Sequence, residues 1–137
     1  ITLELGGKAA NIVFEDAPLD QAVEGIINGI FFNQGHVCCA GSRLLVQESV
    51  YDVVLRKLKD RMESLIVGNP LDKNTDIGAI NSKSQLDTIN HYIKLGKEEG
   101  AECLIGGEEY DNKTYPNACH AKCSNVTYVA GICEDQK

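Results

Sequence analysis

Short apolar runs alternate with longer stretches of helical periodicity along most of the chain, and this alternation limits the possible folds more than any other feature. Residues 11–14 and 43–48 have the length and apolar content of buried strands. Residues 19–35 and 50–66 repeat apolar side chains at the three- and four-residue spacing of a helix. This order predicts an α/β fold, with a parallel-sheet layer and flanking helices.

Local signals predict where the first two helices begin and end. Asp16 is a candidate N-cap, and Pro18 suits the first turn that follows. Gly35 is expected to end the first helix. Ser49 is expected to cap the second helix, with Asp52 in its first turn.

The pattern continues as far as residue 107. A third helix is expected over residues 82–99, ended by Gly100, and a third strand over residues 101–105. Residues 108–137 carry no clean period. We therefore divide the chain into residues 1–107, the α/β portion, and residues 108–137, a divergent tail whose structure the pattern does not predict.

Charge and composition exclude several classes of partner. A net charge of −7 argues against nonspecific nucleic-acid binding, which needs a basic surface. No apolar run approaches the roughly 20 residues that span a bilayer, so no membrane partner is expected. The adjacent pair Cys38 and Cys39 does not resemble a disulfide framework, which favours a reducing compartment and a cytoplasmic location.

The most informative residues for chemistry are a cysteine and a glutamate in two glycine-containing segments. Cys38 lies three residues after Gly35, in the loop expected beyond the first helix, and is a candidate covalent nucleophile. Glu4 precedes the pair Gly6-Gly7 and is a candidate general base. Taken alone, such a cysteine is more often a small buried hydrophobe, and such a glutamate a surface carboxylate.

Both segments resemble signatures of the aldehyde dehydrogenase superfamily. The family's glutamate signature, Leu-Glu-Leu-Gly-Gly-Lys, matches residues 3–8 without a departure. Its cysteine signature, Phe-x-x-x-Gly-Gln/Glu-x-Cys, matches at Phe31, Gly35 and Cys38 and departs once, at His36. The two matches together make Cys38, and not its neighbour, the candidate nucleophile.

The resemblance covers residues 1–107 and implies that they are a fragment of an aldehyde dehydrogenase catalytic domain. Residues 108–137 match neither the Pro-Thr strand nor the Glu-Glu-Ile-Phe-Gly-Pro segment of the family. Residues 40–50 look most like the family-16 branch, whose members are large proteins with more than one dehydrogenase-like region.

The resemblance also implies a reaction: the parent protein would oxidise a small-molecule aldehyde to a carboxylate with NAD or NADP. Cys38 would form a thiohemiacetal and then a thioester, with its own backbone N–H as one oxyanion donor. Glu4 would activate the hydrolytic water, and the backbone of Leu5 would approach the nicotinamide. The family's second donor, an Asn, and its dinucleotide-binding region have no counterpart in this chain, so the isolated chain is expected to be inactive. The parent is expected to be a homo-oligomer.

Other interpretations stay open. The chain could be a non-catalytic scaffold or truncated relative that acts in protein–protein contacts, or a thiol-reactive aldehyde-binding module. His36 could be a polar loop residue tolerated in place of Gln, or an imidazolium that stabilises the thiolate of Cys38. The tail has the residue types of a zinc site without its spacing, so no metal is expected; these residues are Cys119, His120, Cys123 and Cys133.

Overall fold

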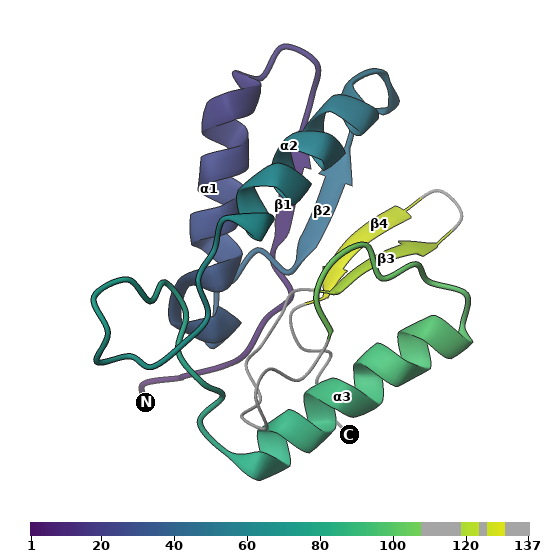
Figure 1. Cartoon of the computed structure of the whole chain (residues 1–137). Helices are drawn as coiled ribbons and strands as arrows, with labels where there is room; N and C mark the ends of the chain where they lie inside the picture. The colour runs from purple at the N-terminus through teal and green to yellow at the C-terminus, as the bar shows by residue number, and fades with distance from the viewer. Residues whose placement is uncertain (108–118, 124–125, 131–137) are drawn as a thin grey trace.

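The computed structural model describes residues 1–107 and two strands of the tail, Cys119–Cys123 and Val126–Ala130 (Figure 1). Strands β1 (Ala10–Val13) and β2 (Arg43–Val46) pair in parallel and form a two-stranded sheet. Helix α1 (Leu19–Phe31) connects them. The parallel pair with its flanking helices confirms the predicted α/β fold.

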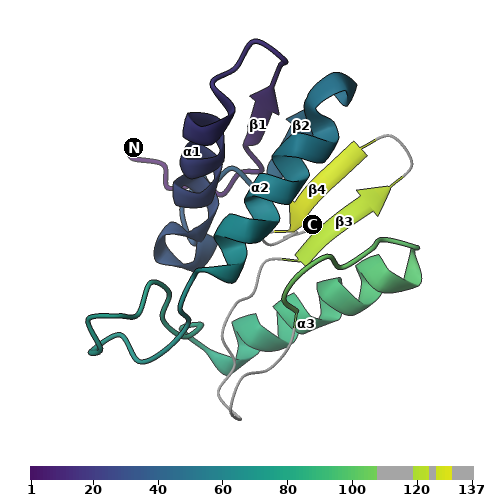
Figure 2. The same ribbon diagram turned by 45° about the horizontal axis from the view of Figure 1, so that its top comes forward.

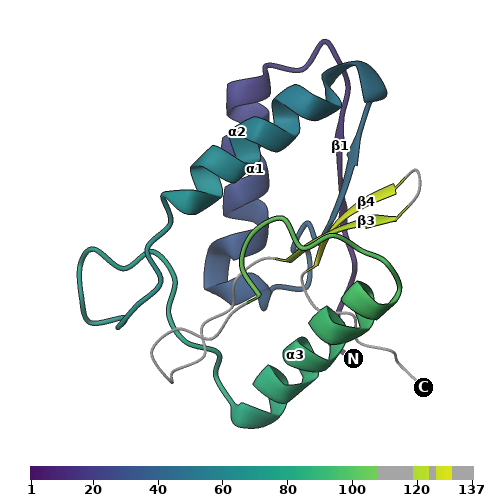
Figure 3. The same cartoon turned by 45° about the vertical axis from the view of Figure 1, so that its right-hand side comes forward.

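The remaining elements follow β2 along the chain. A short 3-10 turn, η2 (Glu48–Val50), leads into helix α2 (Tyr51–Glu63), which lies on the same side of the sheet as α1 (Figure 3). Helix α3 (Lys83–Glu98) lies apart from these two, next to the tail hairpin (Figure 1). The tail strands β3 (Cys119–Cys123) and β4 (Val126–Ala130) pair antiparallel, and β4 lies beside β2 (Figure 2).

The core lies between the sheet and the two helices. The side chains of Val13 and Leu44 point into the core and are at most 4% exposed. They pack against the apolar faces of α1 and α2. The helical members of this cluster are Val23, Ile26, Ile27 and Ile30 of α1 with Val54 and Leu58 of α2. Since side chains in a strand alternate between the two faces, the neighbouring residues point away from the core. On that outer face Ile12 and Phe14 are each 60% exposed, and Leu45 is 37% exposed.

The helix caps expected at Ser49 and Asp16 do not form. The cap that does form was not predicted: Ser82 accepts a hydrogen bond from the N–H of Gln85 at 3.2 Å and caps α3. The prediction for Ser49 was wrong: its hydroxyl donates to Glu15 Oε2 at 2.9 Å, which leaves α2 without a side-chain cap. Asp16 likewise does not cap α1, because the helix begins after Pro18.

The first helix ends four residues earlier than expected. Helix α1 stops at Phe31 and is followed by a tight turn, η1 (Phe32–Gly35). Within this turn Asn33 and Gln34 have φ angles of 50° and 55°, and Gly35 has a φ of 78°. A right-handed helix cannot pass through these left-handed conformations, so the periodic pattern overestimates its length. Gly100, with a φ of 89°, does follow the end of α3 as predicted.

The strand expected over residues 101–105 does not form, and this prediction was wrong. Leu104 and Ile105 instead line a small cavity of about 20 Å³ at the ends of α1 and α2, together with Ile30 and Met62. Their apolar character reflects packing against helices. A short apolar run does not by itself distinguish these two environments.

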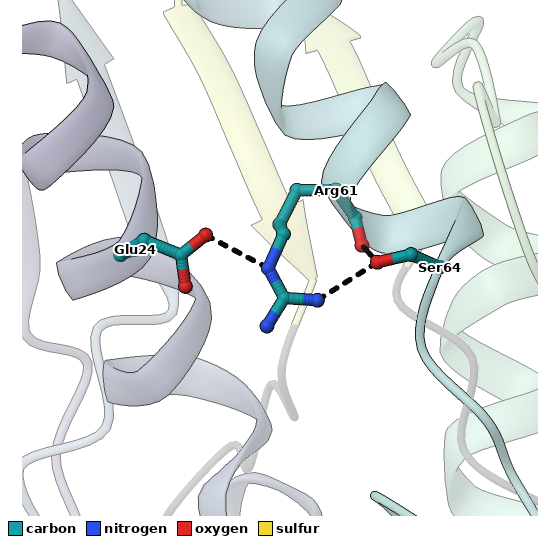
Figure 4. A network of polar contacts seen from close by, with 3 residues as sticks. All are labelled: Glu24, Arg61 and Ser64. Carbon is teal, nitrogen blue, oxygen red and sulfur yellow. Dashed lines mark hydrogen bonds and ion pairs between the residues drawn. The ribbon is translucent and has the colours of Figure 1, made fainter.

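Polar contacts also join α1 and α2 at the rim of the core (Figure 4). Arg61 Nε donates to Glu24 Oε1 at 2.8 Å, and Arg61 Nη1 donates to Ser64 Oγ at 2.8 Å. Lys57 makes a second ion pair, with Asp20, at 2.6 Å. Such exposed pairs contribute only about 0–1 kcal/mol each, so the apolar core carries most of the stability. Among the described residues, no helix combines the length and apolar character that crossing a bilayer requires.

Two adjacent leucines of β2 allow a test of this core. Leu44 is 1% exposed and Leu45 is 37% exposed. We expect Leu44→Ala to lower the free energy of unfolding by about 2–5 kcal/mol, because it opens a cavity in the core. The same change at Leu45 should cost about 1 kcal/mol or less, because that side chain is already in contact with water. Urea unfolding followed by circular dichroism measures both, and equal losses would contradict the assignment of the two faces.

Candidate active site

Cys38 lies in a series of tight turns between α1 and β2. The N–H of Val37 donates to the carbonyl of Gly35 at 2.9 Å, and the N–H of Ala40 donates to the carbonyl of Val37 at 2.9 Å. Cys38 and Cys39 are therefore the two central residues of a four-residue turn. Both cysteines are exposed. The candidate nucleophile thus lies in a loop beyond the first helix, as the sequence predicts.

The far end of this loop is fixed to both α1 and β1. The N–H of Gly41 donates to the carbonyl of Gly29 at 3.2 Å, and Asn11 Nδ2 donates to the carbonyl of Gly41 at 3.1 Å. A Cβ on Gly41 would overlap the side chain of Asn11. Glycine is required here because the two segments approach so closely. The sequence pattern did not identify Asn11 as a residue that supports the site.

The segment that carries Glu4 runs alongside the Cys38 loop. An ideal Cβ on Gly7 would lie 2.8 Å from the carbonyl oxygen of Cys38, a distance that real side chains do not reach. Just beyond it, Arg43 Nε donates to the carbonyl of Lys8 at 2.9 Å. The structure therefore brings the two signature segments together at Gly7 and Cys38, with Glu4 three residues before the contact. The Gly-Gly pair was the only sequence signal for this close approach.

The functional groups themselves are not engaged in the described structure. Within residues 1–107, neither the Glu4 carboxylate nor the Cys38 thiol takes part in a hydrogen bond, and the N–H of Cys38 has no acceptor. Glu4 is exposed, and Leu5 is 64% exposed. The structure therefore leaves a thiol, a carboxylate and a backbone donor accessible on neighbouring segments.

His36 lies inside the turn that precedes Cys38. Its Nδ1 is 3.2 Å from the carbonyl oxygen of Asn33, so the ring contacts the backbone of its own turn. A metal centre finds no support in the described side chains, where no group of three or more His, Cys, Asp or Glu residues could hold an ion. The cysteine and histidine cluster of the tail lies outside the residues whose side chains are described.

The contact between Gly7 and Cys38 predicts different effects at two adjacent glycines. A Cβ on Gly6 would meet no atom within 4 Å, whereas one on Gly7 would strike the carbonyl of Cys38. We expect Gly7→Ala to cost about 1–3 kcal/mol of stability by overpacking. It should also shift the backbone amide resonances of Cys38 and Cys39 in NMR spectra. Gly6→Ala, the matched control, should change the stability by about 1 kcal/mol or less and leave those resonances in place.

Comparisons with known proteins agree with this arrangement. The sequence model of the aldehyde dehydrogenase family matches residues 1–122. An aldehyde dehydrogenase of Davidiella tassiana is 50% identical over 115 residues, which are 84% of this chain and 23% of that protein. The chain thus spans about a quarter of the length of this relative.

Solved structures show the same similarity. Betaine aldehyde dehydrogenase from Staphylococcus aureus, in complex with NAD+, has a TM-score of 0.81 and 37% identity over 85% of this chain and 24% of its own. An NAD-dependent aldehyde dehydrogenase from Sinorhizobium meliloti has a TM-score of 0.78 and 42% identity over 82% of this chain and 22% of its own. An Escherichia coli NADP-dependent enzyme has a TM-score of 0.80 and 36% identity over 85% of this chain and 24% of its own. By sequence and by fold, the chain belongs to the aldehyde dehydrogenase family.

Proposed function

We propose that the chain is the part of an NAD- or NADP-dependent aldehyde dehydrogenase that carries its nucleophile, Cys38, and its general base, Glu4. The observation that carries this proposal is the contact between Gly7 and the Cys38 carbonyl, because these two residues are 31 positions apart in the sequence and yet meet at one site. The family assignment and the fold support aldehyde oxidation as the general activity.

Cys38 supplies the covalent chemistry in this proposal. Its thiolate adds to the aldehyde carbon, and the carbonyl oxygen becomes the oxyanion of a thiohemiacetal. The N–H of Cys38, which has no acceptor within the described residues, is available to bind that oxyanion. Departure of hydride from the same carbon leaves a thioester on Cys38.

A bound nicotinamide would accept the hydride, and the residues around Leu5 fit such a group. Leu5 is 64% exposed, and Gly6 has open space where a side chain would stand. A flat ring can therefore approach the backbone at this point. The NAD- and NADP-dependent structures similar to this chain support a nicotinamide cofactor without distinguishing between the two.

Glu4 acts in the second half of the reaction. Its carboxylate takes a proton from water, the resulting hydroxide attacks the thioester carbon, and the carboxylic acid leaves as the Cys38 thiolate is restored. Glu4 is exposed and has no hydrogen-bond partner among the described residues, so water reaches it freely. Its segment lies beside the Cys38 loop at Gly7, which supports a role for this carboxylate near the acyl group.

The proposal for the whole protein extends beyond the chain. We place the residues that hold the dinucleotide in the rest of a full-length dehydrogenase, since the chain has no Gly-x-Gly-x-x-Gly loop after a strand. The 137-residue chain alone is accordingly inactive with NAD+ or NADP+. The full-length protein is a cytoplasmic homo-oligomer in this proposal. Its catalytic-domain portion is residues 1–107, and residues 108–137 form a divergent tail.

One observation favours the alternative of a non-catalytic scaffold. The outer face of the sheet exposes Ile12, Phe14 and Leu45, which together form an apolar surface of the kind that protein contacts cover. A scaffold would need this face and would not need a reactive Cys38. The reactivity of the thiols therefore separates the two functions.

Thiol labelling tests the assignment of the nucleophile. We expect Cys38 to be the thiol that reacts fastest with limiting iodoacetamide, because it is exposed in a loop whereas Cys103 is half-buried. Mass spectrometry of the labelled peptides measures the order of reaction. Faster labelling of Cys103 or Cys119 would exclude Cys38 as the nucleophile and favour the scaffold.

A substitution at Glu4 tests the general base in a full-length protein that contains this chain. Glu4→Gln should spare thioester formation and slow its hydrolysis by about 10²–10⁴-fold, since an amide cannot take the proton from water. Stopped-flow absorbance should then show a burst of reduced cofactor followed by a depressed steady rate. Glu15 follows β1 whereas Glu4 precedes it, so Glu15→Gln at the opposite end of the strand is the control and should leave both phases intact. Equal loss of burst and steady rate would instead assign Glu4 a role in positioning Cys38.

A further inference from the structure

Three hydrogen bonds join Asn33 and His36 across the turn between them. The carbonyl of Asn33 accepts both from the backbone N–H of His36 at 3.0 Å and from its ring Nδ1 at 3.2 Å. In return, Asn33 Nδ2 donates to the carbonyl of His36 at 3.1 Å. Each residue thus binds the other through its backbone and its side chain.

These bonds close a strained backbone. Asn33, Gln34 and Gly35 are three consecutive residues with positive φ, and the second is a non-glycine residue that rarely adopts this conformation. Such a backbone persists only where the surrounding contacts hold it. The three bonds between Asn33 and His36 are the hydrogen bonds within the described residues that close this turn.

The ring of His36 is part of this arrangement and not a solvated loop side chain. Because a carbonyl oxygen only accepts, Nδ1 carries the proton of the bond to Asn33. The opposite nitrogen, Nε2, is buried and has no hydrogen-bond partner among residues 1–107. Burying an unpaired nitrogen is unfavourable, so the ring keeps this position only because its other contacts compensate. This geometry argues against the interpretation that His36 is merely tolerated in place of Gln.

The turn affects the position of Cys38 because only one residue, Val37, separates Cys38 from His36. The next turn begins inside it, with the bond from Val37 to Gly35, and Cys38 follows at once. Beyond the cysteines the loop is fixed at Gly41, and the Cys38 carbonyl lies against Gly7. With that end held, the direction in which the chain leaves His36 sets the orientation of Cys38.

We infer that His36 is a positioning residue for Cys38, acting with Asn33 through the turn that their hydrogen bonds close. The inference rests on the proposed role of Cys38 as nucleophile. It gives the departure at position 36 a defined role, because the imidazole donates to the Asn33 carbonyl as the amide of a Gln could. A side chain without a donor at this position would release the turn.

The test compares the iodoacetamide labelling rates of Cys38 and Cys39 in the 137-residue chain and reports their ratio. Loss of one such hydrogen bond shifts a conformational equilibrium by about fivefold, so His36→Ala and Asn33→Asp should each lower the ratio at least about threefold. His36→Gln keeps a donor and should stay within about twofold of the unchanged chain. His91→Ala, the same change at an exposed histidine of α3, should leave the ratio unchanged.

The labelling of Cys103 reports whether each variant is folded. Its thiol is half-buried and lies 3.4 Å from the carbonyl oxygen of Gly106, so faster labelling there marks general unfolding. A fall in the Cys38 to Cys39 ratio with Cys103 still protected supports the inference. An unchanged ratio in both His36→Ala and Asn33→Asp overturns it. Absence of any preference for Cys38 in the unchanged chain would instead overturn the proposed nucleophile.

Discussion

The parallel pairing of β1 with β2 is the interaction on which the candidate site depends. In a parallel pair, the segments that lead into the two strands lie at the same edge of the sheet. Residues 1–9 lead into β1 and the Cys38 loop leads into β2, and the register of Ala10 with Arg43 places their last residues side by side. Antiparallel pairing would send these segments to opposite ends of the sheet and separate Glu4 from Cys38.

This location is uncommon for an open α/β sheet. Ligands in such folds usually bind beyond the carboxyl ends of the strands, whereas the two signature segments meet at the amino ends. Two very close backbone approaches make that edge compact. Gly7 lies against the Cys38 carbonyl, and Gly41 lies against Asn11. Glycines in both segments allow such close approach where side chains would hold the loops apart.

Stability and strain are divided between different parts of the molecule. The buried cluster around Leu44 and Val54 holds the sheet to the helices and has no polar requirement. The turn from Asn33 to His36 stores backbone strain next to the candidate nucleophile and depends on hydrogen bonds to persist. A strained segment next to a reactive group is a frequent arrangement in enzymes, because the surrounding fold supplies the energy that holds it.

The sequence predicted features that depend on short-range physical rules. Apolar periodicity located α1, α2, α3, β1 and β2, since burying one face of each element requires it. Helix caps were less predictable. Ser82 and Ser49 have the same side chain, yet only Ser82 caps a helix. The hydroxyl of Ser49 instead donates to the carboxylate of Glu15, which is distant in the sequence. The run over residues 101–105 was misassigned because packing against helices and burial in a sheet demand the same apolar residues.

The sequence by itself determined the family, the parallel α/β arrangement, and the identity of Cys38 and Glu4 as candidate catalytic residues. These follow from local periodicity and from two short motifs, both of which are written in consecutive residues. Only the tertiary structure decided that Gly7 touches Cys38, that Asn11 anchors the loop, and that His36 turns back to Asn33. The physical reason is that these contacts depend on where the backbone goes after folding, and on two left-handed non-glycine residues that no periodic pattern specifies.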